Sequence, residues 1–325
     1  MIWSFSKKSL PLKVNWKLSR NQTTVKENII VSLETSSGTS VSEVAPNIRY
    51  NETIDNIFEQ IKLFQDWSSQ FKSTQEVLLN LDAHPWKHAF RFALESCLVS
   101  DLAKSKNETL STYLNLSPIQ DVPTSFSMPI IPVGEIEDYL KPISRFKSLK
   151  IKVNAETGTE MISEIRKYST AALRVDANEG WTDFDAFMKF QETLKGLKID
   201  FIEQPFPSKL QNEYRALKKN TPYIIMADES IEDVGDFKSL SEQFHAINIK
   251  LMKTGSLIKA RDLLLEAKAH NLKTMIGCMI ETTVGISYGM LYSGMVDFVD
   301  LDGFLLVKDE PFHLVSETEG ILKLN

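Results

Sequence analysis

The chain has 325 residues, 42% of them hydrophobic and 25% charged, which is the composition of a globular protein with room for a large core. Its net charge of −6 argues against a nucleic-acid surface, and no apolar run is long enough to span a membrane. The first ten residues lack the apolar stretch of a secretory signal, and the only two cysteines lie far apart, so we expect a reduced, cytoplasmic protein.

The first third of the chain predicts a small α+β module, residues 1–117. Residues 12–16 and 27–33 have the pattern of strands, and a polar loop, 19–24, joins them. Apolar residues then recur at helical spacing between residues 52 and 116.

From residue 122 onward, short apolar strands alternate with amphipathic helices, which predicts parallel βαβ units. We expect strands at 127–133, 149–154, 173–178, 200–204, 224–229, 246–252, 274–279 and 298–301. Helices are expected at 159–168, 183–194, 210–219, 257–270 and 284–293. Eight such strands favour an α/β fold of the TIM-like barrel type, with an open doubly wound sheet as the alternative. No glycine-rich phosphate loop follows any strand, which weakens a dinucleotide-binding interpretation.

Acidic residues fall at the ends of three successive predicted strands: Asp176, Glu203 and Asp228. One carboxylate in such a place is usually a helix cap or a surface charge. Three of them would converge above the mouth of a barrel, where their mutual repulsion requires a cation. Oxygen ligands without histidine or cysteine suit Mg²⁺, so we predict one Mg²⁺ per subunit at this site.

Lysines are expected on both sides of this metal. Lys150 and Lys152 share one face of their strand, because residues i and i+2 point the same way. Lys250 ends the strand that lies across the barrel. A substrate on the metal would have Lys152 on one face and Lys250 on the other, and the charge of Lys150 would favour neutral Lys152. Bases on both faces of one carbon suit removal and return of a proton α to a carboxylate. The anions that face Lys150 and Lys152 are then the metal-bound carboxylates and the substrate, rather than salt-bridge partners.

The motifs Lys150-Ile-Lys152, Asp176-Ala-Asn, Glu203-Gln-Pro, Ala-Asp228-Glu-Ser and Asn-Ile-Lys250-Leu-Met-Lys together resemble the enolase superfamily, muconate-lactonizing subgroup. The resemblance covers nearly the whole chain. It implies an N-terminal α+β capping domain (1–117), a (β/α)7β barrel (118–310) and a tail (311–325) that completes the cap. One departure is Gly255-Ser256, where the family usually has two glycines.

Within that subgroup, Asp300-Leu301-Asp302-Gly303 is similar to the dipeptide epimerases. The similarity implies an isomerase that inverts the C-terminal residue of a dipeptide by 1,1-proton transfer through an enediolate. Lys152 and Lys250 would be the acid/base pair and Lys150 an auxiliary lysine. Asp300 and Asp302 would bind the free α-ammonium group of the dipeptide, as two carboxylates remote from the metal suit a cation. Arg20 would either pair with an acidic second residue, as in L-Ala-D/L-Glu epimerases, or lie on the surface.

Two other functions stay open. The first is another lysine-pair enzyme of the superfamily: o-succinylbenzoate synthase, N-succinylamino acid racemase or muconate cycloisomerase. Asp300 and Asp302 argue against these, because their substrates lack a free α-ammonium group. The second is a catalytically silent binding protein on the same fold. The sequence decides neither the dipeptide nor between a monomer and a homo-oligomer.

Overall fold

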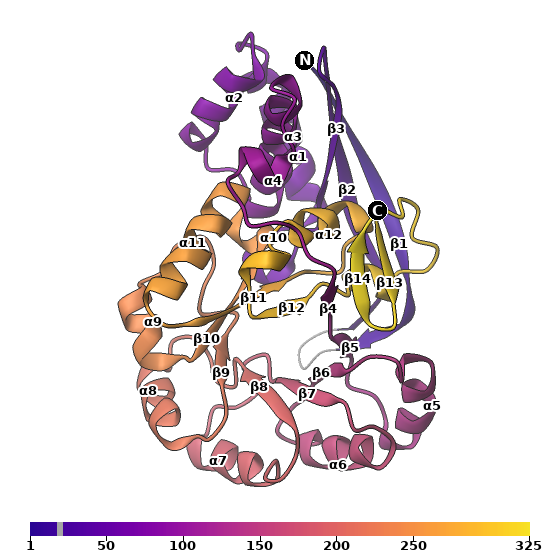
Figure 1. Cartoon of the computed structure of the whole chain (residues 1–325), viewed down its shortest axis with the longest axis vertical. Coiled ribbons are helices and arrows are strands. Elements are labelled where there is room, and N and C mark those ends of the chain that lie inside the picture. Colours follow the sequence, from indigo (N-terminus) through magenta and orange to yellow (C-terminus); the bar gives the residue numbers. More distant parts are fainter. Residues whose placement is uncertain (18–21) are drawn as a thin grey trace.

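The computed structural model describes residues 1–17 and 22–325, which form a cap above a barrel (Figure 1). The cap has an antiparallel sheet in the order β1-β2-β3. Its strands are β1 (Ile2–Lys17), β2 (Gln22–Thr35) and β3 (Gly38–Val44), and its helices are α1 (Ile54–Ser68), α2 (Thr74–Asn80), α3 (His88–Ser105) and α4 (Leu110–Tyr113). Helix α1 starts at a capping box, in which the side chains of Thr53 and Asn56 each accept from the backbone of the other. Its apolar residues Ile57, Ile61 and Phe64 are buried, as their spacing predicted.

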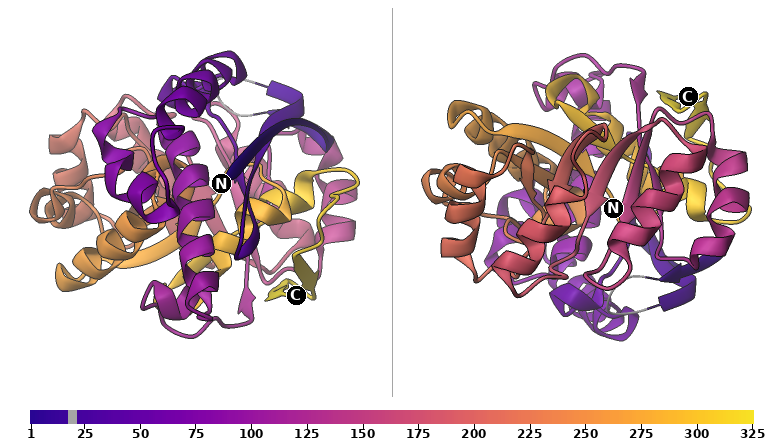
Figure 2. Two further views of the ribbon diagram at one scale, coloured as in Figure 1. Left: turned by 90° about the horizontal axis from the view of Figure 1, so that it is seen from above. Right: turned by 90° about the horizontal axis from the view of Figure 1, so that it is seen from below.

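All eight predicted barrel strands are present, and they pair in the order of the chain. They are β5 (Phe126–Met128), β6 (Ser148–Lys152), β7 (Ala172–Asp176), β8 (Ile199–Glu203), β9 (Ile225–Ala227), β10 (Ala246–Lys250), β11 (Lys273–Gly277) and β12 (Phe298–Asp300). Sequential parallel pairing, with the helices on the outside, identifies a nearly closed α/β barrel and rules out the open doubly wound sheet (Figure 2).

Most helices of this region form the outer ring of the barrel (Figure 2). The helices of the region are α5 (Ile136–Leu140), α6 (Gly158–Tyr168), α7 (Phe184–Glu192), α8 (Gln211–Asn220), α9 (Phe237–Gln243), α10 (Leu251–Thr254), α11 (Leu257–Ala269) and α12 (Thr283–Met290). The five predicted helices are α6, α7, α8, α11 and α12. The sequence interpretation missed α5, α9 and α10, which are too short to show a helical period.

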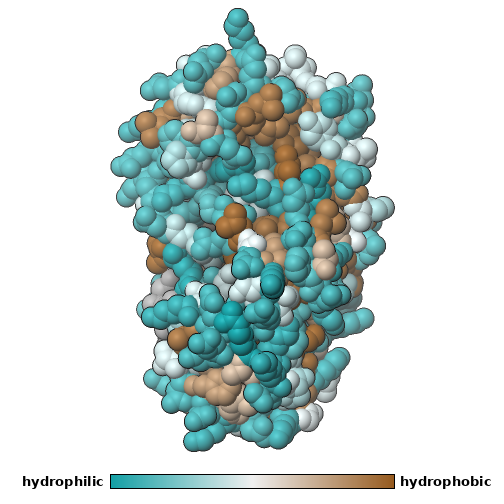
Figure 3. Space-filling view, turned by 90° about the vertical axis from the view of Figure 1, so that its left-hand side faces the viewer, coloured by the Kyte–Doolittle hydropathy of each residue, from teal (hydrophilic) through white to brown (hydrophobic). Residues whose placement is uncertain are grey.

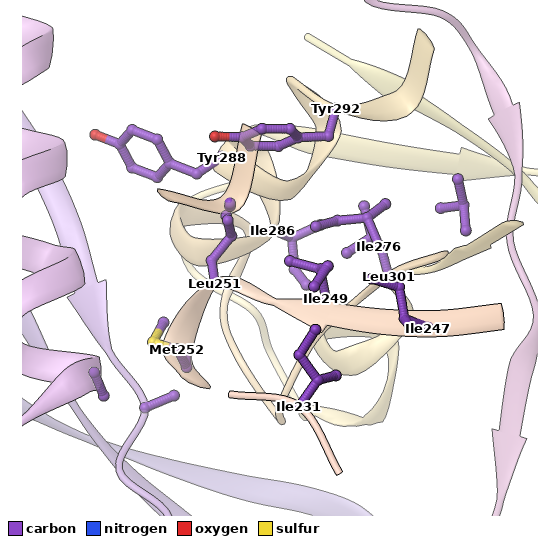
Figure 4. Close-up of a cluster of buried hydrophobic side chains, with 14 of the residues drawn as sticks. Ile231, Ile247, Ile249, Leu251, Met252, Ile276, Ile286, Tyr288, Tyr292 and Leu301 are labelled. Atoms are coloured by element: carbon purple, nitrogen blue, oxygen red, sulfur yellow. The ribbon is translucent and has the colours of Figure 1, made fainter. Parts of the chain in front are cut away.

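Alternation along β10 separates the core from the interior of the barrel. Ile247 and Ile249 point outward into an apolar cluster that also contains Ile276 of β11 and Ile286 of α12 (Figure 4). The intervening side chains therefore point into the barrel. At its base, a small apolar layer of Phe201, Met226, Ala246 and Met275 fills the interior. Above that layer the inward residues are charged or polar.

The C-terminal tail forms a hairpin, β13 (Val315–Thr318) and β14 (Ile321–Leu324), which pairs with β4 (Val122–Pro123), the strand that precedes the first barrel strand in the chain. Just before it, the backbone of Val307 bridges Leu12 of the cap. The domain division at 117 and 310 stays a prediction. None of the helices in the described part of the chain is long and apolar enough to cross a bilayer. On the face shown in Figure 3, the coloured surface is mostly hydrophilic, and the larger apolar areas lie in the upper half.

Candidate active site

A cavity of about 1180 Å³ lies between the cap and the C-terminal ends of the barrel strands. Its walls come from both parts of the molecule. The cap contributes Lys26, Ile48, Arg49 and Tyr50, among others, and the barrel contributes Lys150, Lys152, Asp228, Lys250, Asp300 and Asp302. This is the end of a barrel at which side chains from different strands can meet around a small molecule.

The three predicted metal ligands come together at the C-terminal ends of β7, β8 and β9, and one of them, Asp228, lines the cavity. Asp176 lies opposite Glu203 in the β7–β8 register, and Asp228 follows two residues after Met226, the partner of Glu203 on β9. Asp176 and Glu203 are fully buried and Asp228 nearly so. Three buried carboxylates on neighbouring strands need positive charge close by.

Lysine side chains supply that charge. Lys150 Nζ lies 2.8 Å from Asp300 Oδ2, 2.9 Å from Glu203 Oε2 and 3.1 Å from Asp176 Oδ2. Lys152 Nζ lies 2.5 Å from the same oxygen of Asp176. The expectation that Lys150 and Lys152 lack direct salt-bridge partners is therefore wrong, because both pair with buried carboxylates.

On the opposite side, Lys250 Nζ lies 2.9 Å from Asp228 Oδ2. Strands β6 and β10 are four positions apart in the sheet of eight. Lys152 and Lys250 therefore reach the same group of carboxylates from opposite sides of the barrel, as the sequence predicted.

Each metal-ligand candidate has one oxygen that lies against Lys150, Lys152 or Lys250, which we call the inward oxygen, and a second that accepts a hydrogen bond from a different group, which we call the outward oxygen. The outward oxygens accept hydrogen bonds: Asp176 Oδ1 from Asn178 N (3.1 Å), Glu203 Oε1 from Asn248 Nδ2 (2.9 Å) and Asp228 Oδ1 from Lys253 Nζ (2.7 Å). Asn178 itself has a φ of 44°, in the left-handed region, which asparagine tolerates better than most residues.

This arrangement fits a metal ion by the chemistry of its donors. Each carboxylate offers one inward oxygen, and Glu203 Oε2 has no hydrogen-bond partner among the described residues, although Lys150 lies close to it. Three monodentate oxygens leave room for water and substrate around Mg²⁺. As the side chains stand, no three acidic, histidine or cysteine residues in the described ranges enclose a metal position. The lysines lie against the inward oxygens, so binding of a metal ion requires the lysine side chains to move aside.

The electrostatics of the cluster follow from these contacts. Burial opposes the charge of Lys150, but Asp300, Glu203 and Asp176 outweigh it and hold its pKa well above the ordinary value. Burial likewise opposes the charge of Lys250, and Asp228 raises its pKa in return. The cluster is therefore a set of alternating charges, and Lys250 is held as an ammonium ion as long as it contacts Asp228 in this way.

Asp300 and Asp302 line the cavity and also join the two edge strands of the barrel. Asp300 accepts from Ser125 Oγ (2.5 Å), and Asp302 accepts from Ser127 N (2.5 Å) and Ser127 Oγ (3.3 Å). Burial and the neighbouring Asp300 raise the pKa of Asp302 to about 7. A cationic group in the cavity would relieve this repulsion. Arg20, the remaining predicted substrate residue, lies outside the described residues.

Sequence reasoning missed three contributors. Asn248 and Lys253 stand in the motif around Lys250 but received no role. Asn248 could have been found, since it precedes Lys250 by two residues and so shares its face of β10. Arg49, on the 3-10 turn Ile48–Tyr50, pairs with Glu179 at 2.8 Å and ties the cap to the barrel over the cavity. No sequence pattern signals that contact.

Comparison with known proteins agrees with this architecture. The family described as "Enolase C-terminal domain-like" matches residues 136–311. An L-Ala-D/L-amino acid epimerase of Pedosphaera parvula is 30% identical over 299 residues, which are 90% of this chain and 86% of that one.

Two solved structures resemble the whole chain. One is an enolase family member from Agrobacterium tumefaciens with homology to dipeptide epimerases and with bound sodium and L-Ala-L-Glu. It is 25% identical with a TM-score of 0.90, covering 99% of this chain and 97% of that one. A dipeptide epimerase from Methylococcus capsulatus, complexed with Mg and L-Arg-D-Lys, supports the fold at 24% identity and a TM-score of 0.87, covering 100% and 96%. The resemblance of the motifs is thus confirmed, and the chain belongs to the enolase C-terminal domain-like family of the enolase superfamily.

Proposed function

We propose that this protein is a Mg²⁺-dependent dipeptide epimerase, an isomerase that inverts the α-carbon of the C-terminal residue. The observation that carries the proposal is the placement of Lys152 and Lys250. They reach one group of buried carboxylates from opposite sides of the barrel, at 2.5 Å from Asp176 and 2.9 Å from Asp228. Inversion at carbon needs one group to take the proton from one face and another to return a proton to the other face.

The lysines divide the work. Lys152 takes the α-proton from one diastereomer while Lys250 gives a proton to the opposite face, and the roles reverse for the other diastereomer. Lys150, which also pairs with Asp300 at 2.8 Å, would keep a positive charge beside the substrate carboxylate. Bound Mg²⁺, held by Asp176, Glu203 and Asp228, would act as a Lewis acid that stabilises negative charge on that carboxylate.

The far end of the substrate meets Asp300 and Asp302. Both line the cavity, and both are more than nine-tenths buried, so a substrate ammonium group there gains strong charge-assisted hydrogen bonds. Arg20 is proposed to contact the side chain of the second residue. The two cysteines, Cys97 and Cys278, are unpaired, which supports the proposed cytoplasmic location.

One observation favours a second candidate, an N-succinylamino acid racemase. Asp300 already pairs with Lys150, and Asp302 already accepts from the backbone of Ser127. If these contacts persist with substrate bound, Asp300 and Asp302 stabilise the barrel and do not bind a substrate ammonium group. The same lysine pair would then act on an N-acylated amino acid.

Hydrogen exchange distinguishes the two candidates. The protein is incubated in D₂O with Mg²⁺ and either a dipeptide library or a set of N-succinylamino acids, and products are analysed by mass spectrometry and chiral chromatography. The proposal predicts one deuterium at the C-terminal α-carbon of some dipeptides, together with the second diastereomer. Exchange confined to the N-succinyl compounds would assign the second function instead.

A further inference from the structure

The outward oxygens of the three carboxylates differ in what holds them. Asp176 is held by a backbone amide, Asp228 by a lysine and Glu203 by the neutral side chain of Asn248. We propose that Asn248 is a positioning residue, which fixes Glu203 so that its inward oxygen can bind the metal. The inference rests on the proposed metal site, and its test needs no substrate.

Glu203 depends on such a contact more than its neighbours do. A glutamate carboxylate has one more rotatable bond than an aspartate, so more conformational freedom must be lost to hold it in place. Among the described residues, Glu203 accepts one side-chain hydrogen bond, the 2.9 Å bond from Asn248 Nδ2 to Oε1. Its other oxygen, Oε2, has no hydrogen-bond partner there but lies 2.9 Å from Lys150 Nζ, which must move aside when a metal binds. Metal affinity therefore depends on the outward bond, because it selects the rotamer in which Oε2 points inward.

The barrel is shaped to admit this amide. Asn248 is fully buried on β10, and the neighbouring strand places Gly277 opposite Lys250. A Cβ atom at Gly277 would lie 2.5 Å from Asn248 Oδ1, which is closer than real Cβ contacts come. Glycine at this position thus leaves the space that the amide occupies. Asn248 Oδ1 has no partner among the described residues. The hydrogen bond from Nδ2 to Glu203 is therefore the contact that compensates for burying this amide.

A substitution of Asn248 tests the orientation of Glu203 without changing the charge of the site. Removing Lys253 would leave additional negative charge near Asp228, which attracts a cation even if Asp228 is misplaced. Removing Asn248 changes no formal charge. Any loss of metal affinity in an Asn248 variant therefore reports on the orientation of Glu203.

The chain contains a matched control. Asn28 in the cap is also fully buried, and its Nδ2 donates to Glu43 Oε1 at 2.7 Å and to Ile280 O at 3.0 Å. Glu43 binds the backbone of Thr282 and Gly285 and takes no part in the metal site. Asn28→Ala thus removes the same kind of buried amide-to-glutamate bond at another place.

The experiment measures binding of Mn²⁺ to the metal-free protein by electron paramagnetic resonance and calorimetry. Loss of contacts behind metal ligands typically weakens affinity by about 10- to 100-fold, and we expect this for Asn248→Ala and for the isosteric Asn248→Leu. Asn28→Ala should bind Mn²⁺ as the unmodified protein does. Gly277→Ala keeps Asn248 but displaces its side-chain amide, so it should also weaken Mn²⁺ binding. This variant replaces Asn248→Ala in the experiment if Asn248→Ala does not fold.

Unchanged Mn²⁺ affinity in Asn248→Leu or Gly277→Ala would overturn the proposal. An equal loss in Asn28→Ala would also overturn it, because the effect would then be general destabilisation. Failure to find a dipeptide substrate would instead count against the proposed function alone.

Discussion

Lys150 should stabilise the metal-free protein and become less important once Mg²⁺ is bound. Its side chain is 3% exposed and lies within 3.1 Å of three buried carboxylates, Asp176, Glu203 and Asp300. Lys150→Met keeps the length of the side chain but leaves those carboxylates without their ammonium partner. Removing one member of a buried ion pair costs about 3–5 kcal/mol, because the remaining charge is uncompensated.

The assay is thermal unfolding of the wild-type protein and Lys150→Met, each in EDTA and in excess Mg²⁺. In domains of about 150–250 residues, 1 kcal/mol shifts Tm by about 2–4 °C, so the expected decrease in EDTA is on the order of 10 °C. Mg²⁺ should reduce the difference, since a divalent cation supplies the missing charge. Lys141→Met is the control, since Lys141 forms exposed ion pairs with Glu137 and Asp138, and its Tm should not change. Equal Tm values for wild type and Lys150→Met in EDTA would refute the electrostatic reasoning.

The remaining predictions concern the cap interface, the substrate ammonium site and the metal. Burial, together with Glu43, raises the pKa of Glu281 to about 8. The stabilisation from its protonated form is complete below the ordinary pKa of 4.5 and is lost as the pH rises through 8. Glu281→Gln should therefore lose less stability than wild type between pH 5 and 9 in urea unfolding; parallel pH profiles would show that Glu281 does not titrate in this range. Asp302→Asn should raise KM for dipeptides by about 10- to 100-fold through loss of a charged hydrogen bond, and an unchanged KM would remove Asp302 from substrate binding. EDTA should abolish epimerisation and Mg²⁺ should restore it; turnover that persists in EDTA would remove a metal held by the three carboxylates from the mechanism.

The spacing of apolar and charged residues and the order of the strands were enough to predict the barrel and most of the site residues. The spacing of Lys150 and Lys152 placed both on one face of a strand, and the structure has both pointing into the barrel. Asp176, Glu203 and Asp228 each follow an apolar stretch, so parallel pairing was enough to bring them to one rim. The eight strands were predictable because a barrel strand must be apolar toward the helices, as Ile247 and Ile249 are on β10.

Contacts between distant segments were not predictable in the same way. Asn248 reaches Glu203 across two strand positions, and Asp300 reaches Ser125 only because the barrel nearly closes between its first and last strands. Arg49 meets Glu179 because the cap folds over the barrel. Such pairs depend on the relative placement of whole elements, which no local pattern of residues encodes. The direct pairing of Lys150 with three carboxylates belongs to the same class.

The most direct test of the account is α-proton exchange by Lys152→Ala and Lys250→Ala in D₂O, measured separately on the two diastereomers of a dipeptide substrate. If the two lysines act on opposite faces, each variant loses epimerisation, and each retains deuterium exchange with only one diastereomer, a different one in the two cases. Full epimerisation in either variant, or exchange with the same diastereomer in both, would contradict the two-base mechanism.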